Sequence, residues 1–191
     1  CEMAIFANGH LLSRAEDGPQ DPVGKAATLE LAARIYPWND RVYFELGRTS
    51  FERAAASLGD VRMRDAALAR SAVYFLKALR LNPASAQTHI HLAQSLQYMS
   101  FLSIATPAPY FEEYKTAASL AGHQSQVYFE VGRVLLGRWE ALLPEEKEFT
   151  LEVLKKTLVG KNLERFRDLL EVWYLHCRDY TIIDGIMPED A

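Results

Sequence analysis

The amino-acid sequence predicts an all-α protein built from stacked helical repeats, and three observations lead to this prediction. A heptapeptide at residues 42–48, VYFELGR, nearly recurs at residues 127–133 as VYFEVGR. A weaker copy, THIHLAQ, lies between them at residues 88–94. Apolar residues follow the helical period almost throughout, and alternating runs rich in Val, Ile and Thr are scarce. A pattern that returns every few tens of residues is typical of stacked repeats, which usually work through an extended surface.

Composition and charge argue against some classes of function. Hydrophobic residues make up 49% of the 191 residues and charged residues 24%, as in an ordinary folded protein. The net charge of −4 argues against a nucleic-acid partner that is held by a general positive field. Arg62, Arg64 and Arg70 form a local basic run. Because Asp60 and Asp65 interrupt this run, a solvated helix face is the favoured interpretation.

The two cysteines, Cys1 and Cys177, lie at opposite ends of the chain without a CxxC or zinc-type spacing, so no metal or cofactor is expected. The chain begins at Cys1 without an initiator methionine, which suggests a processed or cut product of something longer. A lipid-modified Cys1 and a boundary just after a membrane anchor or signal segment are the alternatives. The localisation stays open between a periplasmic or membrane-anchored protein and a cytoplasmic one. The longest uncharged stretch, residues 92–111, is too polar and too broken by Pro107 and Pro109 to span a bilayer.

The predicted helices follow one another as pairs, in repeats over about residues 1–37, 38–83, 84–122 and 123–160. The first repeat is degenerate, and its first helix is expected at residues 3–16. Each later repeat follows a residue that ends one helix and a residue that can cap the next. These stop-and-cap pairs are Pro37 with Asn39, Pro83 with Ser85, and the weaker Gly122 with Gln124.

Small residues recur at matching places in the predicted first helices. Gly47, Ala93 and Gly132 take the same position in the three copies of the heptapeptide. Glycine inside a helix costs about 1 kcal/mol relative to alanine, so its return at a matching position suggests a reason in close helix contact. We therefore expect the paired helices to cross closely at these places.

A capping helix is predicted at residues 162–177. Its apolar stripe would cover the last repeat, since an exposed final repeat would leave apolar surface in water. The stripe consists of Leu163, Phe166, Leu169, Leu170 and Trp173. A homodimer contact through this stripe is the alternative. Residues 1–177 are thus predicted to form a single domain, and the tail at residues 178–191 has too little helical signal to assign.

This pattern resembles the tetratricopeptide repeat (TPR) family, over about residues 25–162. The family's repeat has a large residue, then Leu-Gly three and four positions on, and a second helix with Ala, Phe and Ala that ends at proline. The matching residues of the clearest repeat are Tyr43, Leu46, Gly47, Ser71, Phe75, Ala78 and Pro83. The resemblance implies a right-handed α-α superhelix of about three to four helix pairs with a C-terminal capping helix.

The spacing of the repeats departs from that family. Leu92 follows Leu46 by 46 residues and Val131 follows Leu92 by 39, whereas the usual period is about 34. We expect the first excess in longer helices joined by a turn at residues 59–60, and the second in a loop at residues 103–109.

The resemblance also implies a binding surface. In that family the first helices line a concave groove, through the residues one and five positions beyond the large residue. These positions are Phe44, Arg48, Ile90, Gln94, Phe129 and Arg133. The implied function is a non-catalytic protein–protein interaction module that holds an extended, partly acidic segment of a partner whose identity the sequence does not give. The alternative is that the six residues are only half-buried framework.

No catalytic residue is expected. The sequence has no HExxH, no Ser-His-Asp ordering and no phosphate-cradling glycine loop. His89 takes the place of Tyr43 and Tyr128 in the sister repeats, so it is expected to pack between helices. Two other interpretations stay open: a scaffold or assembly domain of a membrane-anchored bacterial cell-envelope protein, in secretion or polysaccharide assembly, and an accessory domain of a larger enzyme.

Overall fold

The computed structural model describes residues 22–57, 59–102, 110–158, 163–177 and residue 182. Within these ranges the chain forms α-helices and one short 3-10 turn, with no strand, and the predicted all-α class is confirmed. The expected helix at residues 3–16 and the loop at residues 103–109 lie outside the described residues, as does the tail apart from residue 182.

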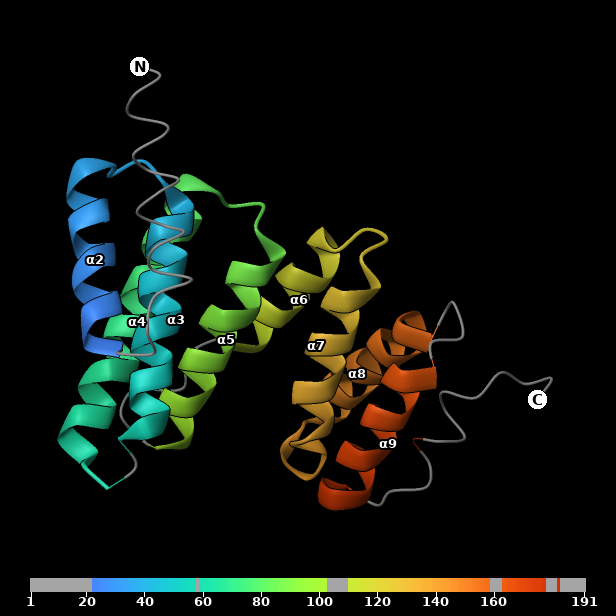
Figure 1. The fold of residues 1–191 in the computed structure, drawn as a ribbon. Coiled ribbons are helices and arrows are strands. Elements are labelled where there is room, and N and C mark those ends of the chain that lie inside the picture. The colour runs from blue at the N-terminus through green and yellow to red at the C-terminus, as the bar shows by residue number, and fades with distance from the viewer. Residues whose placement is uncertain (1–21, 58, 103–109, 159–162, 178–181, 183–191) are drawn as a thin grey trace. The chain divides into compact units, whose positions relative to one another are not determined.

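The chain divides into two compact units, Cys1–Glu113 and Tyr114–Ala191. In the first unit, consecutive helices pack on one another and α3 also meets α5 (Figure 1). Its helices are α2 (Pro22–Ile35), α3 (Asp40–Ala56), α4 (Val61–Leu81) and α5 (Ala86–Phe101), followed by the start of α6 (Tyr110–Leu120). The predicted single domain over residues 1–177 and the right-handed superhelix stay predictions.

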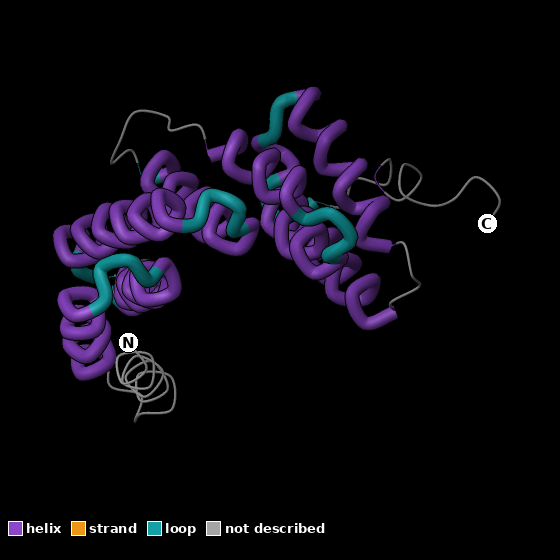
Figure 2. Tube along the Cα trace, turned by 90° about the horizontal axis from the view of Figure 1, so that it is seen from above, coloured by secondary structure: helices purple, strands orange, loops and turns teal. Residues whose placement is uncertain are grey.

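In the second unit, α7 contacts both α8 and α9, and α8 contacts α9. Its elements after α6 are α7 (Ser125–Leu136), the 3-10 turn η1 (Trp139–Ala141), α8 (Pro144–Leu158) and α9 (Leu163–His176). Figure 2 shows the described helices in purple and the loops between them in teal. The helix predicted at residues 162–177 is therefore present as α9, and it lies against the last helix pair.

Two of the predicted helix caps are confirmed. The Asn39 side chain accepts a hydrogen bond from the Arg41 amide at 3.0 Å, at the start of α3. The Ser85 hydroxyl accepts one from the Thr88 amide at 3.3 Å, at the start of α5. Each cap occupies one of the amides that the first turn of a helix leaves without a partner.

Of the remaining turn residues, Gly122 and the turn before α4 agree with the prediction, whereas Gln124 does not act as a side-chain cap. Gly122 adopts a positive φ of 54°, which glycine accepts without steric cost. Gln124, the weaker predicted cap, makes no capping hydrogen bond with its side chain. The expected turn at residues 59–60 lies between α3 and α4, where Asp60 caps α4 by accepting from the Met63 amide at 3.0 Å.

Gly47 and Gly132 each allow a bulky residue of the following helix to lie against the helix backbone. A Cβ added at Gly47 would lie 2.6 Å from Cε1 of Phe75. One added at Gly132 would lie 2.9 Å from Cδ2 of Leu154. Nonbonded carbons are best separated by about 3.5–4.0 Å, so a side chain at either position would require the facing residue to move. The expectation of close crossings is confirmed at Gly47 and Gly132. Ala93, at the matching position of α5, is fully buried.

A second contact recurs in both units. The Nζ atom of Lys77 lies 5.7 Å from the centre of the Tyr43 ring, and that of Lys156 lies 5.4 Å from the centre of the Tyr128 ring. Each lysine stands two positions after the residue that faces the glycine. An ammonium group over an aromatic face is attracted by the ring quadrupole. The repeated heptapeptide therefore forms the same local arrangement twice.

His89 makes polar contacts at the position where packing was expected. Its Nδ1 lies 2.6 Å from Oε2 of Glu113 in α6, and its Nε2 lies 3.0 Å from the Pro83 carbonyl oxygen. In the sister repeat, the Tyr128 hydroxyl donates to the Gly122 carbonyl at 3.1 Å. Both side chains thus reach a carbonyl six positions earlier, and His89 is half-buried and hydrogen-bonded.

None of the described helices combines the length and the apolar character that crossing a bilayer requires.

Candidate binding site

Ile90 does not belong to a contact surface. Its side chain is 0% exposed, so it is part of the core of the first unit and cannot touch a partner. The prediction that this residue lines a groove is wrong. The helical period alone put Ile90 beside the groove, but the helices packed around α5 enclose it.

Phe44 joins an aromatic cluster that holds three helices together. Its ring centre lies 5.8 Å from that of Phe75 in α4 and 5.3 Å from that of His91 in α5. The His91 ring stacks on Phe75 at 5.6 Å. Phe44 and Gln94 are both half-buried. The main role of Phe44 is therefore structural, with part of its surface left accessible.

The guanidinium group of Arg48 is held by acidic neighbours. Its Nη2 lies 3.2 Å from Oε2 of Glu45, and its Nε lies 3.4 Å from Oε1 of Glu52. Glu45 is only 5% exposed, and the Lys25 ammonium in α2 approaches the same oxygen at 3.6 Å. Arg48 therefore compensates a buried carboxylate, while its side chain stays 40% exposed and its groove role stays a prediction.

Phe129 and Arg133 lie in α7, in the second unit, one helical turn apart and on the same side of the helix. Phe129 is half-buried, with the guanidinium carbon of Arg165 5.9 Å from its ring centre. Arg165 also donates to the hydroxyl of Ser125 at 2.5 Å. Arg133 is exposed. These two groove positions remain candidates for contact with a partner.

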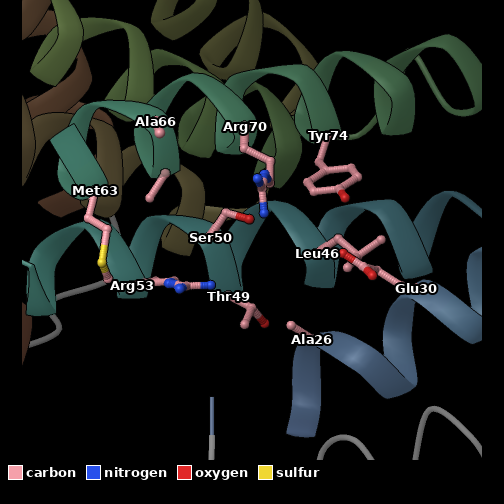
Figure 3. Close-up of a pocket in the computed structure, with 11 residues that line it drawn as sticks. Ala26, Glu30, Leu46, Thr49, Ser50, Arg53, Met63, Ala66, Arg70 and Tyr74 are labelled. Carbon is pink, nitrogen blue, oxygen red and sulfur yellow. The ribbon is translucent and has the colours of Figure 1, made fainter. Parts of the chain in front are cut away.

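A pocket of about 140 Å³ lies between α2, α3 and α4 in the first unit (Figure 3). Its apolar lining comes from all three helices and includes Ala26, Leu46 and Ala67. Two arginines also line it, Arg53 from α3 and Arg70 from α4. None of the six predicted groove residues contributes to this pocket.

The pocket carries excess positive charge. Glu30 is the one acidic group among its lining residues, against the guanidinium groups of Arg53 and Arg70. Arg64, close by in sequence, is paired with Asp65 at 2.9 Å. No ion pair between described residues involves either pocket arginine. The arginines of the basic run at residues 62–70 therefore have different surroundings: Arg64 is paired with an aspartate, whereas Arg70 lines the pocket.

Hydroxyl groups add hydrogen-bonding capacity to this lining. Thr49 is 4% exposed, and its Oγ1 is buried without a hydrogen-bond partner. The neighbouring Ser50 also lines the pocket. Burial raises the pKa of the Tyr74 phenol above its ordinary value; the negative charge of Glu30 raises it further, and the positive charge of Arg70 acts in the opposite direction. The pocket therefore combines hydroxyl groups with charges that act on one another.

Sequence reasoning did not identify these pocket residues. Thr49 and Arg53 are one helical turn apart in α3, as are Arg70 and Tyr74 in α4. Such spacings place residues on one side of a helix, but they do not show which other helix faces that side. Among the described residues, no group of three His, Cys, Asp or Glu side chains could hold a metal ion.

The chain was compared with known proteins. No protein-family model matches it, and no curated protein is significantly similar to it.

Proposed function

We propose that this chain is a non-catalytic protein-interaction module of the TPR-like kind, which binds an extended segment of a partner protein. The recurrence of one local arrangement carries this proposal. A tyrosine under a lysine, together with a glycine that receives a bulky side chain, occurs in both units. Repeat units of this kind present broad surfaces made of helix faces.

The stiffness of the helix pairs supports this function. Side chains held by close contacts lose little conformational entropy when a ligand binds, so more of the interaction energy appears as affinity. The aromatic cluster around Phe75 and the contacts at Gly47 and Gly132 give this kind of preorganisation. An extended peptide advances about 3.3 Å per residue, so a short segment can reach several helix faces.

A peptide selection tests the proposal. Random twelve-residue peptides are displayed on phage and selected against the immobilised 191-residue chain, and enriched sequences are then titrated in solution by fluorescence anisotropy. We expect related sequences with saturable binding and a Kd of about 1 μM, or about −8 kcal/mol. Enriched peptides that fail to saturate in solution, or no enrichment at all, would contradict the proposed function.

Variants in each unit then locate the contact. Arg133→Ala removes an exposed charge from the predicted groove position in α7. The pair Arg53→Gln and Arg70→Gln removes the charge of the pocket. The matched control is Arg34→Gln with Arg80→Gln, which neutralises two exposed arginines of α2 and α4 that do not line the pocket.

A further inference from the structure

We propose that the pocket between α2, α3 and α4 is a subsite for a glutamate side chain of the bound segment. This inference rests on the proposed function, because it names the chemistry that one part of the partner brings. It concerns a different place from the predicted groove, since the pocket is lined by the second helices α2 and α4 together with α3.

The size of the pocket suits one side chain. Its volume is about 140 Å³, close to the roughly 150 Å³ of an engineered protein cavity that holds benzene. Ala26, Leu46 and Ala67 provide apolar surface for the methylene groups of a short stem. A ligand with an apolar stem and a polar end therefore fits the lining better than a fully hydrated ion.

The charge of the pocket selects an anion for that polar end. Figure 3 shows the Arg70 side chain extending from α4 toward α3, and Arg53 lying along α3 on the same side. A guanidinium group presents planar, forked donors that match the two oxygens of a carboxylate. A lysine or arginine side chain would instead meet two like charges. Glu30 in the lining disfavours a doubly charged group such as a phosphate more strongly than a single carboxylate.

The Thr49 hydroxyl is the second, independent observation. Thr49 lines the pocket and is 4% exposed as a residue, and its Oγ1 atom is buried without a hydrogen-bond partner. Buried polar groups are nearly always hydrogen-bonded, so an unpaired one calls for a specific explanation. A carboxylate oxygen in the pocket would accept a hydrogen bond from the Thr49 hydroxyl, and Ser50 beside it offers another donor.

The test uses a minimal probe on the whole chain. N-acetyl-glutamic acid amide is titrated into the protein while the methyl NMR signals of Ala26, Thr49, Met63 and Ala67 are recorded, since these residues line the pocket. The matched probe is N-acetyl-glutamine amide, which has nearly the same shape without the charge. We expect saturable shifts at these methyl groups with a Kd of about 1 mM for the glutamate probe, and binding at least tenfold weaker for the glutamine probe.

Variants connect the shifts to the pocket. Arg53→Gln with Arg70→Gln should abolish the glutamate-dependent shifts, whereas Arg34→Gln with Arg80→Gln should leave them unchanged. Thr49→Val keeps the size of the side chain and removes only the hydroxyl, so it serves if the double arginine variant does not fold. It should weaken binding of the glutamate probe about fivefold to tenfold, the factor that corresponds to one hydrogen bond.

The outcomes separate this inference from the proposed function. The glutamate subsite would be overturned if the two probes bound equally well. It would also be overturned if the glutamate probe did not shift the signals of these methyl groups. If selected peptides still bind in that case, the interaction module stands without it. Conversely, a probe that binds at the pocket while no peptide is selected would show that the pocket binds a carboxylate, but it would overturn the module and the assignment of the pocket to a bound segment.

Discussion

The ring of Phe75 lies against the backbone of Gly47, in the space that the Cβ of any other residue would need. Cε1 and Cδ1 of the ring would be 2.6 and 2.7 Å from such a Cβ. The contact joins α3 to α4, and the same ring stacks on His91 of α5. Gly47 therefore determines how closely three consecutive helices approach one another.

Replacing Gly47 with leucine should destabilise the first unit. Overfilling a well-packed core costs about 1–3 kcal/mol and occasionally more, which exceeds the gain in helix propensity of about 0.8 kcal/mol. The free energy of unfolding from a urea titration measures the effect. Gly59→Ala is the control, because nothing lies within 4 Å of a Cβ at that position. A Gly47→Leu chain as stable as the control would contradict the role given to this contact.

Ser71→Ala should lower the free energy of unfolding by about 1 kcal/mol, the usual net value of one hydrogen bond. The Ser71 hydroxyl is fully buried, donates to the Gly47 carbonyl at 2.9 Å and lies 3.0 Å from the hydroxyl of Ser95. Ser119→Ala is the matched control, since that hydroxyl is exposed and bonds only within its own helix, to the Thr116 carbonyl. A loss at Ser71 no greater than at Ser119 would show that the buried link between helices adds no stability.

Arg48→Met should destabilise the chain by about 1 kcal/mol, between the values for exposed and for buried ion pairs. The change keeps the apolar stem but leaves the buried carboxylate of Glu45 with Lys25 as its remaining cationic partner at 3.6 Å. Arg53→Met is the control on the same helix, because Arg53 forms no ion pair with the described residues. Thermal denaturation of both variants measures the difference, and equal shifts in Tm would refute the role of Arg48 as a counter-ion.

The pKa of Tyr74 should respond in opposite directions to two changes in the pocket. Burial is the largest cause of the raised pKa. The negative charge of Glu30 raises the pKa further, and the positive charge of Arg70 lowers it. Glu30→Gln should therefore lower the pKa of Tyr74, and Arg70→Gln should raise it. The ultraviolet absorbance of the phenolate, taken as the difference from a Tyr74→Phe chain, measures both shifts. Shifts of the same sign would show that these charges do not act on the phenol.

The raised pKa also predicts how stability depends on pH. The folded chain keeps the Tyr74 proton at pH values where the unfolded chain, with an ordinary pKa of about 10, has released it. The stability that this pKa shift of Tyr74 contributes is fully present below about pH 10, and it is lost as the pH rises through the folded-state pKa. As the pH rises above about 10, stability of the wild type should therefore fall more steeply than stability of Tyr74→Phe. Parallel curves would contradict this linkage.

The sequence allowed much of the fold to be predicted, because the relevant signals are local. Caps, glycines and the apolar period act within one or two helical turns, so Asn39, Ser85 and the turn before α4 could be recognised directly. The close contacts at Gly47 and Gly132 were also predictable, since a costly residue recurs at one position of the heptapeptide. The partners in those contacts, Phe75 and Leu154, required the structure.

The candidate site was harder to predict because it depends on how three helices face one another. The position of Arg53 relative to Arg70 follows from the crossing of α3 and α4, which no pattern within either helix determines. The pairing of Arg48 with Glu45 likewise competes with any role in binding, and a heptapeptide does not show which role prevails. Ile90 was misplaced for the same reason, since its burial comes from neighbouring helices.

The fit between Gly47 and Phe75 has an evolutionary consequence. Because the ring fills the volume beside residue 47, a lineage that acquired a larger side chain there could tolerate it only after residue 75 had become smaller. Residues 47 and 75 should therefore vary as a coupled pair among descendants of this gene, even where the rest of the heptapeptide has diverged.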